Sequence, residues 1–247
     1  MSEQRCLWCL EHFAVAFSWS WVVGGGTGKL CNECNSKMEK ITSVICKECG
    51  RPNIGNVKMT GEAQCSDCMR WSAIPPWSSQ PFLHRALYIY NPFIQEFIAR
   101  YKYRGDVELA TLFVDDLVSL AREMGGFDIV TTIPLREKRE WERGFNQADV
   151  LAGKFRMVEP LLNRVKNSED KQSKRTREDR LAALSGAFAL REDVERSSLV
   201  GKRILLVDDI YTTGATLRSA GATLYSMGAK SVAAVSVARS IGASGEK

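Results

Sequence analysis

The cysteines constrain this chain most, because all eight lie within its first 68 residues and each belongs to a C-x-x-C pair. The four pairs are Cys6/Cys9, Cys31/Cys34, Cys46/Cys49 and Cys65/Cys68. Two thiolates separated by two residues can hold one tetrahedral ion from a tight turn, and a second pair completes a four-thiolate shell. Four redox dithiols in succession have no obvious purpose, so the pattern predicts structural zinc sites instead.

The spacing of the pairs predicts which of them share an ion. Fifteen residues separate Cys49 from Cys65, which fits a four-cysteine zinc ribbon well, and 21 separate Cys9 from Cys31. We therefore expect residues 1–70 to form two successive zinc ribbons that bind about two zinc ions, with an interleaved, cross-braced pairing left open. A closed four-thiolate shell leaves no position for a substrate, so both ions would be structural.

The same N-terminal region holds the longest apolar stretch, which runs from Phe13 to Gly26. It is shorter than the roughly 20 residues that span a bilayer, and it lacks the flanks of a signal peptide. We expect a cytoplasmic protein without a membrane span, and leave open its attachment to the inner face of the membrane through partners. The net charge of +5 permits a nucleic-acid or phosphate-rich partner without requiring one.

The composition changes after Cys68. Residues 71–82 hold three of the seven prolines and predict an extended linker, followed by a domain at 83–240 and a tail at 241–247. Apolar runs predict strands at 84–90, 127–133, 161–165, 203–207 and 231–238. Helical patterns begin at Pro92 and cover 107–124, 147–155 and 216–227. Apolar strands separated by helices indicate an α/β domain whose parallel sheet is covered on both faces.

Residues 204–217 (ILLVDDIYTTGATL) combine two acids with a turn of small residues. The apolar strand delivers Asp208 and Asp209 to its carboxyl end, where open α/β sheets bind ligands. The turn that follows consists of Thr212, Thr213, Gly214, Ala215 and Thr216. Its backbone N–H groups and hydroxyls can surround one phosphate, and the positive end of the next helix dipole adds to this. Carboxylates beside such a cradle predict a sugar-phosphate site.

This segment resembles the phosphoribosyl pyrophosphate (PRPP) signature of the type I phosphoribosyltransferases. With the cysteine pairs, the segment 133–152 (IPLREKREWERGFNQADVLA) and the basic loop 164–180, it is similar to the ComF competence family from Cys6 to about Ala238. Residues 142–147 (ERGFNQ) and Tyr211 are particularly similar. The resemblance implies a type I phosphoribosyltransferase domain preceded by a four-cysteine zinc module. It also implies a role in natural transformation, with an ATP-driven DNA translocase and single-stranded DNA as partners.

The resemblance also implies roles for particular residues. Asp208 and Asp209 would be the catalytic acids that contact ribose, and residues 212–216 would hold the 5′-phosphate. The turn after residue 132, with Leu135 and Arg136, would meet pyrophosphate. Mg2+ would arrive with PRPP. The basic loop would act as a flexible flap through Lys174, Arg175, Arg177 and Arg180.

Two classes of function follow from these observations. One is an enzyme that transfers a phosphoribosyl group, a reaction that needs no strong general base and so agrees with a chain that has only His12 and His84. The other is a non-catalytic DNA-uptake adaptor that binds single strands and a translocase. No base-recognition motif identifies an acceptor. Trp8, Trp19 and Trp21 could stack on bases or could pack the small zinc-ribbon cores.

Overall fold

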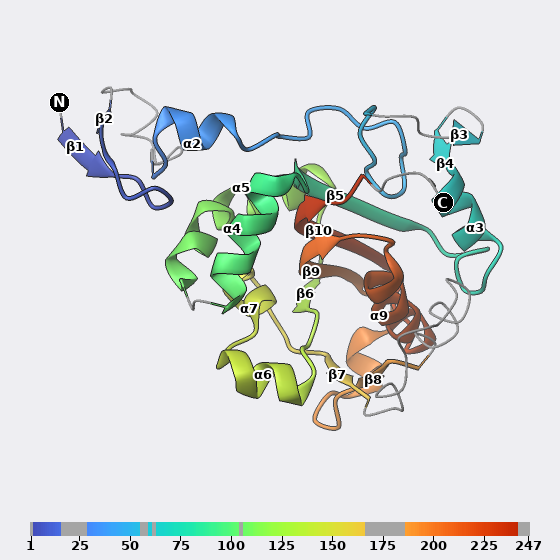
Figure 1. Ribbon diagram of the computed structural model, residues 1–247. Helices are drawn as coiled ribbons and strands as arrows, with labels where there is room; N and C mark the ends of the chain where they lie inside the picture. Colours follow the sequence, from blue (N-terminus) through green and yellow to red (C-terminus); the bar gives the residue numbers. More distant parts are fainter. Residues whose placement is uncertain are drawn as a thin grey trace.

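The computed structural model describes residues 2–15, 29–54, 59–60, 63–103, 106–165 and 186–241. Four parallel strands form its central sheet in the order β5-β10-β9-β6 (Figure 1). They are β5 (Phe82–Ile89), β6 (Ile129–Thr132), β9 (Arg203–Tyr211) and β10 (Ser231–Arg239). The parallel sheet confirms the α/β class predicted from the apolar strands.

Helices cover both faces of this sheet (Figure 1). One layer contains α4 (Pro92–Tyr103), α5 (Val114–Glu123) and α7 (Gln147–Leu151). The other contains α9 (Ala215–Ser226) and the hairpin of β7 (Leu162–Arg164) and β8 (Phe188–Leu190). Alternate residues of β9 enter the two cores, with Leu205 and Val207 in one and Ile204 and Leu206 in the other. The middle strands are apolar throughout because both of their faces are buried.

Each cysteine-rich segment packs onto a different core. The first segment, with β1 (Ser2–Arg5), β2 (His12–Val15) and α2 (Asn32–Ser36), joins the α4 and α5 side. The second, with β3 (Met59–Thr60), β4 (Gln64–Cys65) and α3 (Ser66–Ser72), joins the α9 side. Each face of the sheet therefore carries one cysteine-rich segment.

The chain between the two segments runs along the outer edge of β5 (Figure 1). The N–H of Ile41 donates to the carbonyl of Leu87 at 2.8 Å, and the N–H of His84 donates to the carbonyl of Glu48 at 2.7 Å. These bonds pair backbone groups that an edge strand would otherwise expose. The cysteine-rich region is thus joined to the sheet by backbone hydrogen bonds.

Several elements differ from the sequence prediction. Segment 71–82 is not an extended linker throughout, since α3 includes Trp71 and Trp77 is buried against Phe82 and Tyr225. The helix expected over 107–124 is a 3-10 helix at Val107–Leu112 followed by α5, and the one expected over 147–155 ends at Leu151.

After residue 83, two short helices were not predicted, α6 (Glu137–Arg143) and the 3-10 helix Arg196–Leu199; α2 and α3 of the cysteine-rich segments were not predicted either. Strand β9 extends to Tyr211 because its pairing with β10 continues that far. Lys174, Arg175, Arg177 and Arg180 lie outside the described residues. Within the described ranges, no helix combines the length and apolar character that crossing a membrane requires.

Candidate functional site

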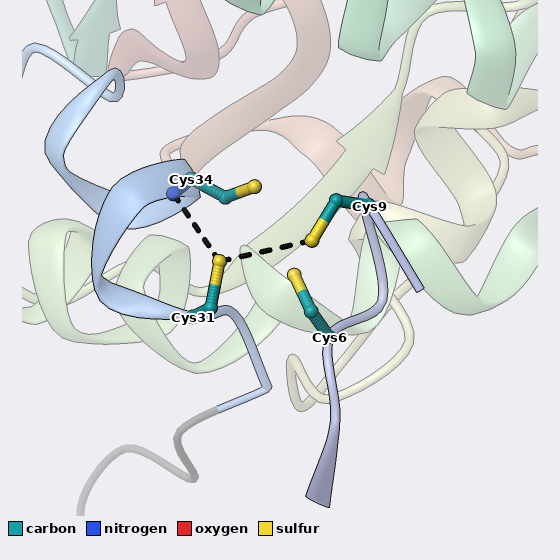
Figure 2. A group of neighbouring side chains, drawn as sticks. All are labelled: Cys6, Cys9, Cys31 and Cys34. Atoms are coloured by element: carbon teal, nitrogen blue, oxygen red, sulfur yellow. Dashed lines mark hydrogen bonds between the residues drawn. The ribbon is translucent and has the colours of Figure 1, made fainter. Parts of the chain in front are cut away.

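The eight cysteines form two groups of four. Cys6, Cys9, Cys31 and Cys34 are the first cysteine group, whose side chains point toward one another (Figure 2). Cys46, Cys49, Cys65 and Cys68 are the second cysteine group. The Sγ atoms of Cys9 and Cys31 are 3.8 Å apart, and those of Cys49 and Cys65 are 3.6 Å apart. Tetrahedral zinc with Zn–S bonds of about 2.3 Å needs a separation of about 3.8 Å, so both groups fit one zinc ion each. This grouping matches the successive pairing and not the cross-braced alternative.

The two groups differ in their surroundings. All four cysteines of the second group are at most 1% exposed, whereas Cys9 of the first group is exposed. Two buried guanidinium groups reach the second group: Arg239 Nη2 lies 2.9 Å from Cys49 Sγ, and Arg218 Nη2 lies 3.6 Å from Cys68 Sγ. Four thiolates around a divalent ion carry a net charge of −2, which these two arginines can balance in the interior.

The acid pair lies within the last part of β9. Asp208 accepts a hydrogen bond from the N–H of Asp209 at 2.9 Å, and Asp209 forms an ion pair with Lys102 of α4. Burial, together with the charge of Asp209, raises the pKa of Asp208 to about 8. The sequence analysis missed Lys102, because no local pattern connects a lysine in one helix to a carboxylate far along the chain.

The turn of residues 212–216, here called the phosphate turn, connects β9 to α9. Gly214 has a φ of +79°, and a Cβ there would lie 2.2 Å from the hydroxyl oxygen of Tyr211, so only glycine fits. Thr212 and Thr213 are exposed. The first turn of α9 follows directly, with the N–H of Ala215 3.4 Å from the hydroxyl of Thr213, and the N-terminus of a helix favours anions. The indole N–H of Trp71 donates to the carbonyl of Thr213 at 3.2 Å.

A second turn follows β6, the neighbour of β9 in the sheet. The N–H of Ile133 donates to the carbonyl of Val207 at 3.1 Å, so the turn with Leu135 and Arg136 starts beside the acid pair. Asn146 donates to the carbonyl of Ile133 at 3.1 Å and caps α7 by accepting from the N–H of Ala148. The segment 142–147 therefore has a structural role in holding this turn.

The structure thus brings together most of the residues predicted to form the site. Asp208, Asp209, the phosphate turn and the turn at 133–136 share the carboxyl edge of the sheet, because parallel strands end at the same edge. Trp71 and Lys102 join this edge without having been predicted. The four predicted flap residues lie outside the described part of the chain.

Neither histidine lies among the acids and turns of this edge. His84 is fully buried between the carbonyl of Cys49, at 3.1 Å, and the hydroxyl of Ser236, at 2.9 Å. This burial lowers the pKa of His84 well below its usual value, so the ring is neutral. His12 is exposed and does not belong to the first cysteine group.

The tryptophans differ in their availability for base stacking. Trp8 stacks on Phe97 with ring centroids 5.0 Å apart, so it packs the first cysteine-rich segment onto α4. Trp19 and Trp21 lie outside the described residues. Trp141 of α6, which the sequence analysis did not single out, is 88% exposed.

Comparisons with known proteins place this geometry in context. Residues 143–247 match the phosphoribosyl transferase domain family. The chain is 36% identical to the competence protein ComFC of Bacillus subtilis (strain 168) over 240 residues, 95% of each chain. It is 30% identical to competence protein ComFC of Streptococcus pneumoniae (strain ATCC BAA-255 / R6) over 95% of this chain and 100% of that protein. The DNA utilization protein YhgH of Escherichia coli (strain K12) is 27% identical over 82% of this chain and 87% of its own.

Proposed function

The chain belongs to the family of ComFC competence proteins, and on this premise we propose that it binds PRPP, or a related phosphoribosyl ligand, during DNA uptake. Two relatives are named for competence and one for DNA utilization. The same premise implies an ATP-driven DNA translocase as a partner. It also implies about two zinc ions, one in each cysteine group, which hold the N-terminal segments in their folded form.

The observation that carries this proposal is the contact between Gly214 and Tyr211. Glycine at this position lets the turn close tightly against Tyr211 with a positive φ, which places the backbone of the phosphate turn directly before the N-terminus of α9. The 5′-phosphate would bind there, and Asp208 and Asp209 would accept hydrogen bonds from the ribose hydroxyls.

The chemistry assigned to these residues is mainly positioning. In phosphoribosyl transfer, positive charge develops at C1 of the ribose while pyrophosphate leaves, so the protein must orient the sugar and stabilise the leaving anion. The turn with Leu135 and Arg136 would face that anion. Mg2+ bound to PRPP would neutralise part of the pyrophosphate charge.

Calorimetric titration with PRPP and Mg2+ tests this proposal. The wild-type protein should bind, and Asp209→Asn should bind more weakly because a neutral amide is a poorer acceptor than a carboxylate. Asp193→Asn, which removes an exposed carboxylate that pairs with Arg191, is the matched control and should bind normally. Equal affinity in all three proteins would place the ligand elsewhere. Release of pyrophosphate with a panel of bases would identify an enzyme, and its absence would favour an adaptor.

The exposure of Trp141 favours single-stranded DNA as a second ligand. Its indole is 88% exposed on α6, whose sequence also carries Lys138 and Arg139. Stacking on an aromatic side chain contributes about 1–3 kcal/mol per base. Binding of a labelled oligonucleotide should therefore weaken at least several-fold in Trp141→Ala, and should fall as salt rises. Met157→Ala, another exposed apolar position, is the control. Absence of binding at low salt would exclude this second function.

A further inference from the structure

The second cysteine group and the phosphate turn are linked first through α3. This helix carries both Cys68, a member of the group, and Trp71. The indole N–H of Trp71 donates to the carbonyl of Thr213 in the phosphate turn at 3.2 Å. The position of α3 therefore sets where this hydrogen-bond donor lies relative to the turn.

A second link passes through Tyr211. The carbonyl of Cys49 accepts a hydrogen bond from Arg239 Nε at 2.8 Å. The same carbonyl lies 3.1 Å from Nδ1 of His84. Both of these side chains lie against the ring of Tyr211, at centroid distances of 4.9 Å for Arg239 and 4.0 Å for His84. The hydroxyl of that ring fills the space beside Gly214. The Tyr211 ring is thus held between the cysteine group and the turn.

A third link passes through Arg218, which is 1% exposed. Its backbone N–H donates to the carbonyl of Gly214 at 2.8 Å, while its guanidinium contacts Cys68 Sγ and forms an ion pair with Glu48 at 3.1 Å. The guanidinium also lies over the ring of Trp71, 5.3 Å from its centroid. One side chain therefore joins α9, the second cysteine group and the aromatic donor of the first link.

The first cysteine group makes different contacts. Arg100 of α4 donates to the carbonyl of Trp8 at 2.9 Å, and Trp8 stacks on Phe97 of the same helix. These contacts lie in the core on the opposite face of the sheet from α9. Helix α4 also carries Lys102, the ion-pair partner of Asp209, so the first group is a control for the phosphate turn and not for the acid pair.

We propose that the second cysteine group, when it holds its metal ion, positions the phosphate turn, so that metal and phosphoribosyl ligand bind cooperatively. The inference rests on the proposed function of the turn. A metal ion ties the Cys46/Cys49 segment to the α3 segment through four bonds, and so fixes Trp71, Arg218 and Tyr211 together. Coupling between two sites is reciprocal: if the metal improves ligand affinity, the ligand must improve metal affinity by the same factor.

Equilibrium competition for zinc with a coloured chelator measures this coupling in the wild-type protein. We expect two equivalents to transfer, and saturating PRPP with Mg2+ to raise the chelator concentration needed to remove one of them by about fivefold or more. Cys9→Ser, which removes the exposed ligand of the first group, should retain the protected equivalent. Gly214→Ala, whose Cβ would collide with Tyr211 and displace the phosphate turn, should lose the protection. Unchanged release of both equivalents, while calorimetry shows PRPP bound, would overturn the inference and leave the proposed function standing. Calorimetry without any PRPP binding would overturn the proposed function itself.

Trp71→Phe tests the positioning role without touching a cysteine. It keeps an aromatic ring near Arg218 but removes the donor to Thr213, which should weaken PRPP binding about 2- to 10-fold while two zinc ions remain bound. The protection of one zinc by PRPP should shrink in parallel, which a purely structural role would not cause. Trp8→Phe, the matched variant in the first segment, should keep the wild-type affinity for PRPP and the full protection of one zinc ion by PRPP. Wild-type affinity and full protection in Trp71→Phe would contradict the proposal.

Discussion

Asp208 and Asp209 are neighbours in β9 with different environments. Asp209 has Lys102 as an ion-pair partner, whereas burial and the nearby charge of Asp209 raise the pKa of Asp208 to about 8. The folded protein therefore keeps a proton on Asp208 at a pH where the unfolded chain, with a carboxyl pKa of about 3.9, has released it. Such a group lowers folding stability as pH rises from about 4 to about 8, which is a cost expected at a ligand site.

Asp208→Asn should therefore stabilise the ligand-free protein. The gain in unfolding free energy should be larger at pH 8 than at pH 5, because across that interval only the wild-type fold must keep a proton that its unfolded chain has released. Urea denaturation at the two pH values measures it. Asp193→Asn, at an exposed carboxyl, should show no such gain. A gain that is equal at both pH values would show that Asp208 is not held protonated by the fold.

At the scale of elements, α7 holds the turn after β6. Asn146 caps α7 and donates to the carbonyl of Ile133, so Asn146→Ala removes a cap and a buried hydrogen bond together. Loss of an N-cap costs about 0.5–2 kcal/mol. We expect the unfolding free energy to fall by about that amount in urea denaturation. Relative to the wild-type protein, the affinity for PRPP, which carries the pyrophosphate, should fall more than the affinity for ribose 5-phosphate. Asn163→Ala, at an exposed position of β7, is the control and should change neither the unfolding free energy nor the affinity for PRPP. If Asn146→Ala also changed neither, Asn146 would not hold the turn after β6.

The same scale shows what the sequence could predict. The central strands were predictable because residues such as Leu205 and Leu206 are apolar on both faces. The cysteine spacing favours the grouping that the structure shows but leaves a cross-braced pairing open. Helix α6 was missed because none of its residues is buried, which leaves no apolar period. Contacts such as those between Lys102 and Asp209, and between Trp71 and Thr213, depend on tertiary packing and leave no local pattern.

For the whole molecule, the two cores are each completed by a cysteine group. Since a small segment with few core residues depends on its metal to fold, removal of zinc should lower the melting temperature. The first equivalent should leave from the first group, because Cys9 is exposed while the second group is fully buried. Metal analysis and melting curves with increasing chelator measure both effects. A metal-free protein with an unchanged melting temperature would contradict the assignment of structural zinc.

The central claim is that a phosphoribosyl ligand binds at the phosphate turn, and one matched pair of variants tests it most directly. Gly214 and Gly201 both have positive φ, of +79° and +74°, but only at Gly214 would a Cβ meet another residue. Both alanine variants place a Cβ at a similar positive φ, so calorimetric titration with PRPP and Mg2+ separates backbone strain from displacement of the phosphate turn by the collision with Tyr211. The account predicts wild-type affinity in Gly201→Ala and a loss of at least tenfold in Gly214→Ala. Equal affinity in the two variants would contradict it.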